Sequence, residues 1–268
     1  MKTQTIFVKI IFFFIFLLFG CKATVEENIE KGDEMISNSE IDKALVYYNK
    51  ALEIDSTSSI VYLKIGNLYL NNSDTTKALN FFEIAHNLNS KDYNLQLKLG
   101  NIYKSKKDTL NAIMHYTNAI EIDDKKSEAY IERGKLFFYT KQYELSLNDF
   151  NQSITIGRTE LLYLVDEEKG ISKNIRGEEE VKEIIYPYII PYVFRVQIKE
   201  INKDYLGAIS DADFIINCMP DYGSIYFIRG NIHFILGNSK EACEDWSKAN
   251  DYGIEEGLKK IQSFCTPI

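Results

Sequence analysis

The sequence is poor in the residues that interrupt helices. It contains only four prolines and fourteen glycines among 268 residues, too few for a chain dominated by linkers or by short strands and turns. In contrast, 45% of the residues are hydrophobic and 26% are charged, which is ordinary for a folded protein. We therefore expect a folded, mainly helical chain.

The sequence also lacks an excess of positive charge. Lysine and arginine number 31 against 39 acidic residues, which gives a net charge of −8. Binding to nucleic-acid phosphates requires clustered lysine and arginine. Nucleic acid is therefore not an expected partner.

The common motifs of catalytic and metal sites are absent. His86, His115 and His233 are far apart in the sequence, which contains neither HExxH nor a cysteine pair at metal-ligand spacing. Glycine-rich phosphate loops are missing too, and no nucleophile with a base partner can be identified. We predict that the protein is not an enzyme and has no metal, cofactor or small-molecule substrate.

The first 20 residues differ from the rest of the chain. Lys2 and Lys9 precede an uncharged, mostly apolar run of eleven residues, 10–20. A membrane-spanning helix needs about 20 apolar residues, whereas a basic start followed by a short apolar run is typical of a signal peptide. Residues 1–20 are therefore predicted to be a leader.

The tetrad Leu18-Phe19-Gly20-Cys21 ends this leader and resembles the lipobox of bacterial lipoproteins. The resemblance implies cleavage before Cys21, diacylation of its sulfur and acylation of its amino group, with residues 21–24 as a short tether. Two or more acyl chains hold a protein stably on a membrane. Lys22 stands where some bacteria place an inner-membrane retention aspartate, so the resemblance implies the outer membrane of a bacterial cell envelope. An uncleaved anchor and plain secretion are the alternatives.

Four glycines, Gly32, Gly66, Gly100 and Gly134, lie 34 residues apart. A small residue follows each of them after 12 positions, an aromatic residue after 16 and a second small residue after 19. The three sets are Ala44, Ala78, Ala112 and Ser146; Tyr48, Phe82, Tyr116 and Phe150; and Ala51, Ala85, Ala119 and Ser153. This pattern resembles the tetratricopeptide repeat. It implies an all-α, right-handed α-solenoid of stacked helix pairs.

The pattern stops after the fourth repeat and resumes at Gly230, with a degenerate unit before it in which Val196 replaces the glycine. We assign residues 25–158 to repeats 1–4, 159–188 to an insertion, 189–256 to repeats 5 and 6, and 257–268 to a capping helix and tail. The insertion is interpreted either as a long connection with one extra helix or as a lid or partner contact.

Three cysteines remain after Cys21. Disulfides are permitted in an exported protein, and Cys243 and Cys265 fall on two consecutive helices that are expected to pack antiparallel. They form either a bridge or two buried thiols. Cys218 is most simply a buried thiol.

On the first helix of each repeat, the residues three before, one after and four after the glycine share one face, which in the family lines the concave surface. The row after the glycine is polar, and the row three before it is apolar. Asparagine can bond both the N–H and the C=O of a peptide backbone. The candidate residues of a peptide-binding groove are Asn67, Asn101, Asn231, Lys135, Leu63, Leu97, Ile131 and Phe227. Alternatively, the asparagines are merely compatible with an exposed surface.

The favoured function is a lipid-anchored scaffold that binds a protein or peptide partner in this groove and, by resemblance, serves cell-envelope assembly or secretion. The alternatives are a structural or self-assembling spacer, and a regulator that acts through the 159–188 insertion.

Overall fold

The computed structural model describes residues 23–166, 170–171 and 178–265, with side chains for residues 23–158 and 185–265. The predicted leader and Cys21 lie outside these ranges. Within them, no helix is both long and apolar enough to cross a membrane. The chain forms two compact units, Met1–Ile102 and Tyr103–Ile268, which we call unit 1 and unit 2.

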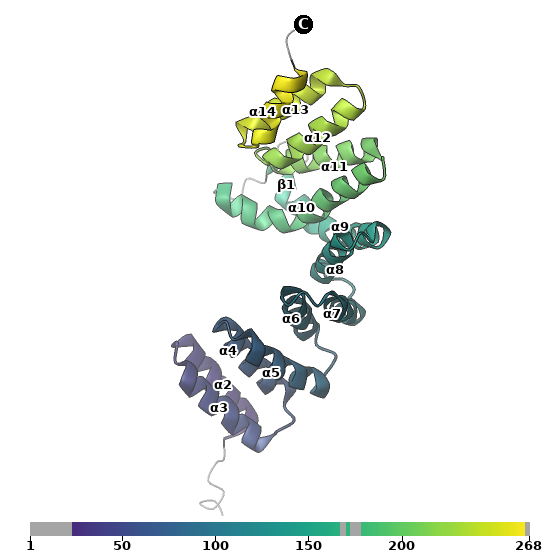
Figure 1. Cartoon of the computed structure of the whole chain (residues 1–268). Coiled ribbons are helices and arrows are strands. Elements are labelled where there is room, and N and C mark those ends of the chain that lie inside the picture. Colours follow the sequence, from purple (N-terminus) through teal and green to yellow (C-terminus); the bar gives the residue numbers. More distant parts are fainter. Residues whose placement is uncertain (1–22, 167–169, 172–177, 266–268) are drawn as a thin grey trace, which may run out of the picture. The chain divides into compact units, whose positions relative to one another are not determined.

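The described residues are almost entirely helical, and consecutive helices form antiparallel pairs (Figure 1). Unit 1 contains α2 (Val25–Ser37), α3 (Ile41–Ile54), α4 (Ser59–Asn71), α5 (Thr75–Leu88) and all but the end of α6 (Tyr93–Ser105). Unit 2 continues with α7 (Thr109–Ile122), α8 (Ser127–Tyr139), α9 (Tyr143–Leu164), α10 (Glu178–Ile201), α11 (Tyr205–Cys218), α12 (Gly223–Ile235), α13 (Ser239–Asp251) and α14 (Glu255–Phe264). The predicted all-α solenoid of helix pairs with a C-terminal capping helix is confirmed.

The repeated glycines are explained by close packing within each helix pair. A Cβ added at Gly66 on α4 would lie 2.5 Å from Cε1 of Phe82 on α5, closer than atoms can approach. Ala44, Tyr48 and Ala51 on α3 are buried in the same way against α2 and α4. The 34-residue spacing therefore reflects equivalent packing contacts between helices in successive repeats.

Three of the turns inside the pairs are closed by an aspartate cap. Asp74, Asp108 and Asp204 each precede the second helix of a pair and accept a hydrogen bond from the backbone N–H three residues later, which satisfies one of the free donors at a helix start. The residue before each of them has a positive φ of 61–63°.

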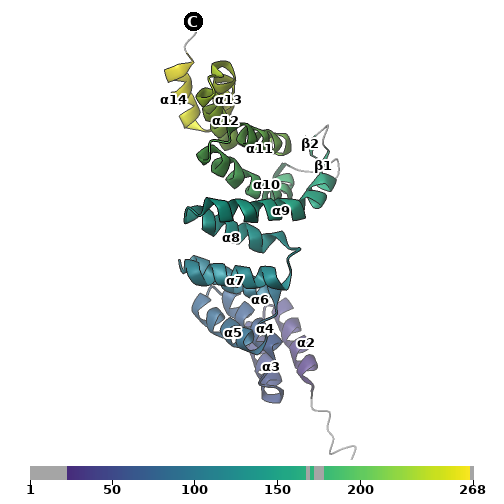
Figure 2. The same ribbon diagram turned by 90° about the vertical axis from the view of Figure 1, so that its right-hand side faces the viewer.

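The insertion lengthens two helices instead of adding a third. Residues 157–164 continue α9, and α10 begins at Glu178, eleven residues before the predicted start of repeat 5. Between them, Val165–Asp166 and Gly170–Ile171 form an antiparallel pair of short strands, β1 and β2 (Figure 2). The expected extra helix is therefore wrong for the described residues, because the apolar segments on both sides of the polar stretch extend the neighbouring helices.

The end of unit 2 is closed by α14. A disulfide joins Cys243 on α13 to Cys265 just after α14, with a Cα–Cα distance of 5.8 Å. Closing a loop of this length stabilises a fold by roughly 3 kcal/mol in the chain-entropy model. Cys218 is a buried free thiol, as predicted, and burial raises its pKa to about 11.

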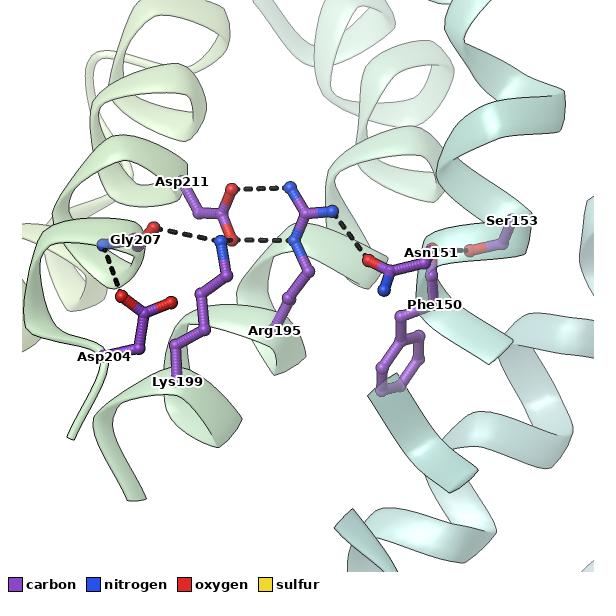
Figure 3. Close-up of polar contacts among 8 residues, drawn as sticks. All are labelled: Phe150, Asn151, Ser153, Arg195, Lys199, Asp204, Gly207 and Asp211. Atoms are coloured by element: carbon purple, nitrogen blue, oxygen red, sulfur yellow. Dashed lines mark hydrogen bonds and ion pairs between the residues drawn. The ribbon is translucent and has the colours of Figure 1, made fainter. Parts of the chain in front are cut away.

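Three arginines of unit 2 tie successive helix pairs together, and we call each such contact an arginine clasp. In repeat 5, Nε and Nη2 of Arg195 donate to the two carboxylate oxygens of Asp211 at 2.7 and 2.6 Å, while Nη1 donates to Oδ1 of Asn151 at 2.9 Å (Figure 3). Asp211 belongs to the same repeat and Asn151 to the second helix of the preceding one. Each clasp therefore joins the two helices of one pair and also joins that pair to the preceding pair.

The other two clasps use the same positions. Arg133 binds Asp149 and Thr117, and Arg229 binds Asp245 and Asp213. In all three, the arginine and its bidentate aspartate are 16 residues apart. The Arg195 clasp spans the insertion, so repeats 4 and 5 stack in the same register as repeats 5 and 6.

We predict that Arg133→Met lowers the free energy of unfolding by about 3 kcal/mol, because it leaves the Asp149 carboxylate buried without a counter-charge. Asp149 is only 4% exposed, and burial already raises its pKa despite the opposing hydrogen bond and charge of Arg133. In the variant the folded-state pKa rises further above the unfolded value, so the native state binds the additional proton and the lost stability returns as the pH falls.

Urea denaturation at neutral and acidic pH measures this effect. The double variant Arg133→Met, Asp149→Leu is the control and should recover most of the loss. A single variant as stable as the wild type at pH 7 would show that the clasp contributes nothing to unit 2.

Candidate binding face on the first helices

The candidate face in unit 1 lies on α4 and α6. Leu63 and Asn67 on α4 and Asn101 on α6 are half-buried, whereas Leu97 on α6 is only 8% exposed. Leu97 therefore presents little apolar surface to a ligand. The side chains that unit 1 can offer are mainly those of Leu63 and Asn67.

The one charged residue of the first repeat in the row after the glycine, Asp33, is neutralised by residues of the protein itself. Oδ1 of Asp33 accepts a hydrogen bond from the Tyr48 hydroxyl at 2.6 Å, and both carboxylate oxygens accept from Nζ of Lys64 at 2.7–2.8 Å. Lys64 belongs to the first helix of the second repeat. The ion pair thus joins neighbouring first helices instead of remaining open to a ligand.

Lys135 is also engaged within the protein. Glu132 accepts hydrogen bonds from Lys135 at 2.8 Å and from Lys104. Burial acts to raise the pKa of Glu132, but the two lysines outweigh it and the net shift is downward. Two cations share one carboxylate at this point, so these three side chains together carry a charge of +1.

Two of the candidate asparagines, Asn67 and Asn231, differ in whether the aromatic residue on the second helix of their repeat can donate a hydrogen bond to them. In the last repeat, Nε1 of the buried Trp246 donates to Oδ1 of Asn231 at 3.1 Å. The side-chain oxygen of Asn231 is therefore already used by a buried residue of the core. In the second repeat the equivalent aromatic residue is Phe82, which has no polar atom, and Asn67 forms no hydrogen bond to any described side chain.

Sequence reasoning missed this distinction, although the signal was present. The aromatic residue 16 positions after the glycine is tyrosine in the first repeat and tryptophan in the last, and there the residue after the glycine accepts its hydrogen bond. Phenylalanine in repeat 2 cannot donate. The row after the glycine should thus be read together with the aromatic row.

The remaining apolar candidates, Phe227 and Ile131, contact other residues of unit 2. Phe227 on α12 packs against the main hydrophobic core of unit 2. Ile131 and Ser127 on α8 line a pocket whose other walls come from α9 and α10. These walls are Ser153, Ile154, Gly157 and Arg158 of α9 and Pro187, Tyr188, Pro191 and Tyr192 of α10.

Two of the three histidines contact other side chains on neighbouring helices. Nδ1 of His86 is 2.8 Å from Nε2 of Gln96, and the His115 ring stacks on Tyr103 with centroids 5.3 Å apart. No group of three or more histidine, cysteine or acidic side chains that could hold a metal ion occurs in the part of the chain that the structure describes.

Two segments of the chain match models of the tetratricopeptide repeat, residues 47–80 and 93–126. A search of curated proteins found no match. Together with the structural neighbours below, the matches show that the chain contains tetratricopeptide repeats, and proteins of this kind bind protein or peptide partners.

Several solved structures share the fold. YrrB, described as a tetratricopeptide-repeat protein with an unusual peptide-binding site, has a TM-score of 0.63 at 16% identity and covers 80% of this chain and 97% of its own. PilF of Pseudomonas aeruginosa has a TM-score of 0.58 at 13% identity and covers 91% and 93%. Yeast Tom70 has a TM-score of 0.52 at 16% identity and covers 89% and 46%. At these identities the likeness concerns the fold alone.

We predict that Asn231→Ala lowers the free energy of unfolding by about 1–2 kcal/mol, because the buried Trp246 N–H loses its acceptor. Asn67→Ala should change it by less than about 0.5 kcal/mol. Trp246 is the only tryptophan in the chain, so urea unfolding followed by its fluorescence measures both variants, and the native emission should shift only in Asn231→Ala. Equal effects of the two substitutions would contradict the assignment.

Proposed function

We propose that the protein is a lipid-anchored scaffold of the bacterial cell envelope, held on the outer membrane, that binds a peptide segment of a protein partner along its first helices. The observation that carries the binding part is Asn67, a half-buried amide that forms no hydrogen bond to a described side chain and lies one helical turn from Leu63. An amide left open beside an apolar side chain can bond a peptide backbone while the apolar neighbour contacts a ligand side chain.

The anchoring part is supported by the lipobox-like tetrad and by where the fold begins. Thr24 caps α2, with its side chain accepting from the Glu27 N–H and the Glu27 side chain accepting from the Thr24 N–H. Only residues 21–24 would join the acylated cysteine to the first helix. Four extended residues span at most about 14 Å, so the anchor would hold the first repeat close to the membrane.

The lipid anchor predicts that labelled palmitate enters the wild-type protein in cells and does not enter Cys21→Ala, which has no thiol to acylate. The measurement is label per molecule of purified protein from the membrane fraction. Cys265→Ala serves as the control and should be labelled like the wild type. Equal labelling of the wild type and Cys21→Ala would contradict the anchor.

The binding face predicts that Asn67→Ala weakens partner binding by about 5- to 30-fold, the effect of losing one or two hydrogen bonds worth about 1–2 kcal/mol. The partner is first identified by crosslinking in intact envelopes and mass spectrometry, and its affinity is then measured with purified proteins. Asn80→Ala, an exposed asparagine on α5, is the matched control. Undiminished affinity of Asn67→Ala would refute the role of this face, and concentration-dependent oligomers without a captured partner would favour a spacer.

A further inference from the structure

The turns inside the helix pairs of unit 2 expose large apolar side chains at equivalent positions. Five residues after the repeat glycine or its replacement stand Tyr139, Ile201 and Ile235, which are 70%, 49% and 54% exposed. Ten residues after it stand Leu110 and Leu206, which are 83% and 76% exposed. Each of the four turns in unit 2 therefore carries at least one such side chain.

The same positions are polar or small in the first repeats. Repeats 1 and 2 have Ser37 and Asn71 five residues after the glycine, and Asp42 and Thr76 ten residues after it. In unit 2 only three of the eight equivalent positions are polar, Ser105, Glu144 and Lys240. A single exposed leucine needs no explanation. A change of residue class at the same turn positions in successive repeats indicates a shared surface.

The four turns lie along one edge of unit 2. The three arginine clasps contact equivalent positions on the preceding second helices, Thr117, Asn151 and Asp213. Successive pairs therefore stack in one register, and the turns within the pairs point the same way. The β1–β2 hairpin follows the opposite end of α9 (Figure 2). We call the edge formed by residues 105–110, 139–144, 201–206 and 235–240 the turn edge.

Lysines stand beside the apolar side chains on the turn edge. Lys107, Lys141 and Lys203 are exposed and occupy the left-handed turn position, with φ of 60–61°. Repeats 1 and 2 have Ser39 and Ser73 there. Over the turn edge, five lysines against Asp108, Glu144 and Asp204 give a charge of +2, whereas Glu40, Asp42 and Asp74 give −3 over the corresponding residues 37–42 and 71–76.

This combination fits a lipid surface better than a protein surface. The cores of protein interfaces are contiguous and depleted in lysine, whereas here each turn has one or two exposed apolar side chains and at least one lysine. Lysine at a bilayer interface keeps its ammonium among anionic headgroups while its stem and its apolar neighbours reach below them.

We propose that the turn edge of unit 2 lies on an anionic lipid bilayer, with the tips of Leu110, Tyr139, Ile201, Leu206 and Ile235 in the interface. The contact goes beyond the proposed anchor and rests on it only for holding the protein at the surface, where a short tether makes weak contacts effective. The occupant is a bilayer that contains anionic phospholipid.

The test uses the full-length lipid-anchored protein in vesicles of phosphatidylethanolamine and phosphatidylglycerol. A nitroxide is attached at Leu206→Cys, or at Thr76→Cys as the control at the equivalent turn position of repeat 2. Cys218 is buried and Cys243 and Cys265 are bridged, so labelling is directed to the new thiol. Collision rates with membrane-soluble oxygen and with a water-soluble nickel complex report where each nitroxide lies.

The proposal expects a severalfold higher oxygen-to-nickel ratio at residue 206 than at residue 76, and a fall at residue 206 when phosphatidylcholine replaces phosphatidylglycerol. Equal ratios at the two residues in anchored protein overturn it. A water-exposed residue 206 whose substitution abolishes partner binding overturns it in favour of a protein-binding edge.

If the protein carries no acyl chain, the anchor has failed and sedimentation with the same vesicles tests the edge directly. Sedimentation that is lost in the double variant Leu110→Ser, Leu206→Ser supports the contact. Sedimentation that is absent, or is unchanged in that variant, overturns it.

Discussion

The contact between a glycine on the first helix and an aromatic ring on the second is the constraint on which this structure depends. At Gly66 and Phe82 there is no room for a Cβ, and at Gly230 a Cβ would lie 2.8 Å from the Trp246 ring. The aromatic ring therefore packs against the backbone of the first helix. Because of this closeness, the polar atom of a tyrosine or tryptophan ring can reach the residue next to the glycine, so a packing rule also determines which side chains on the candidate face are engaged within the core.

The fold could be predicted from the sequence because its determinants are local and repeated. A 34-residue period of small and aromatic residues specifies a helix pair, and stacking follows since no pair can bury its apolar face alone. The insertion was harder to predict. Pro187 and Pro191 would ordinarily argue for interruption, yet both lie inside α10, where the helix contacts α9 and the surrounding packing outweighs the local cost.

The candidate site could be predicted only as a set of positions. Helical spacing correctly placed Leu63 and Asn67 on one half-buried surface, but whether a side chain on that surface is available depends on partners that are 15 to 31 residues away. Asn231 is bonded by Trp246, and Asp33 by Tyr48 and Lys64. Such partners depend on rotamer geometry across two helices, which periodicity does not encode. The arginine clasps escaped notice for a related reason, since a 16-residue spacing between arginine and aspartate has no meaning until the two helices are known to be antiparallel.

The clasps also account for where the chain could accept an insertion. In repeats 2 and 3 the residue before the glycine is buried and apolar, Ile65 or Leu99, so no arginine clasp forms from that position, and the burial of these side chains is not directional. In unit 2 a planar guanidinium binds both oxygens of one carboxylate and a third acceptor on the preceding pair, an arrangement with strict geometry. Between Asn151 and Arg195 that geometry is re-formed across the whole insertion. Additional residues there alter the lengths of α9 and α10 without shifting the stack, and this constancy of register is what allows one edge of unit 2 to present equivalent side chains from four successive turns.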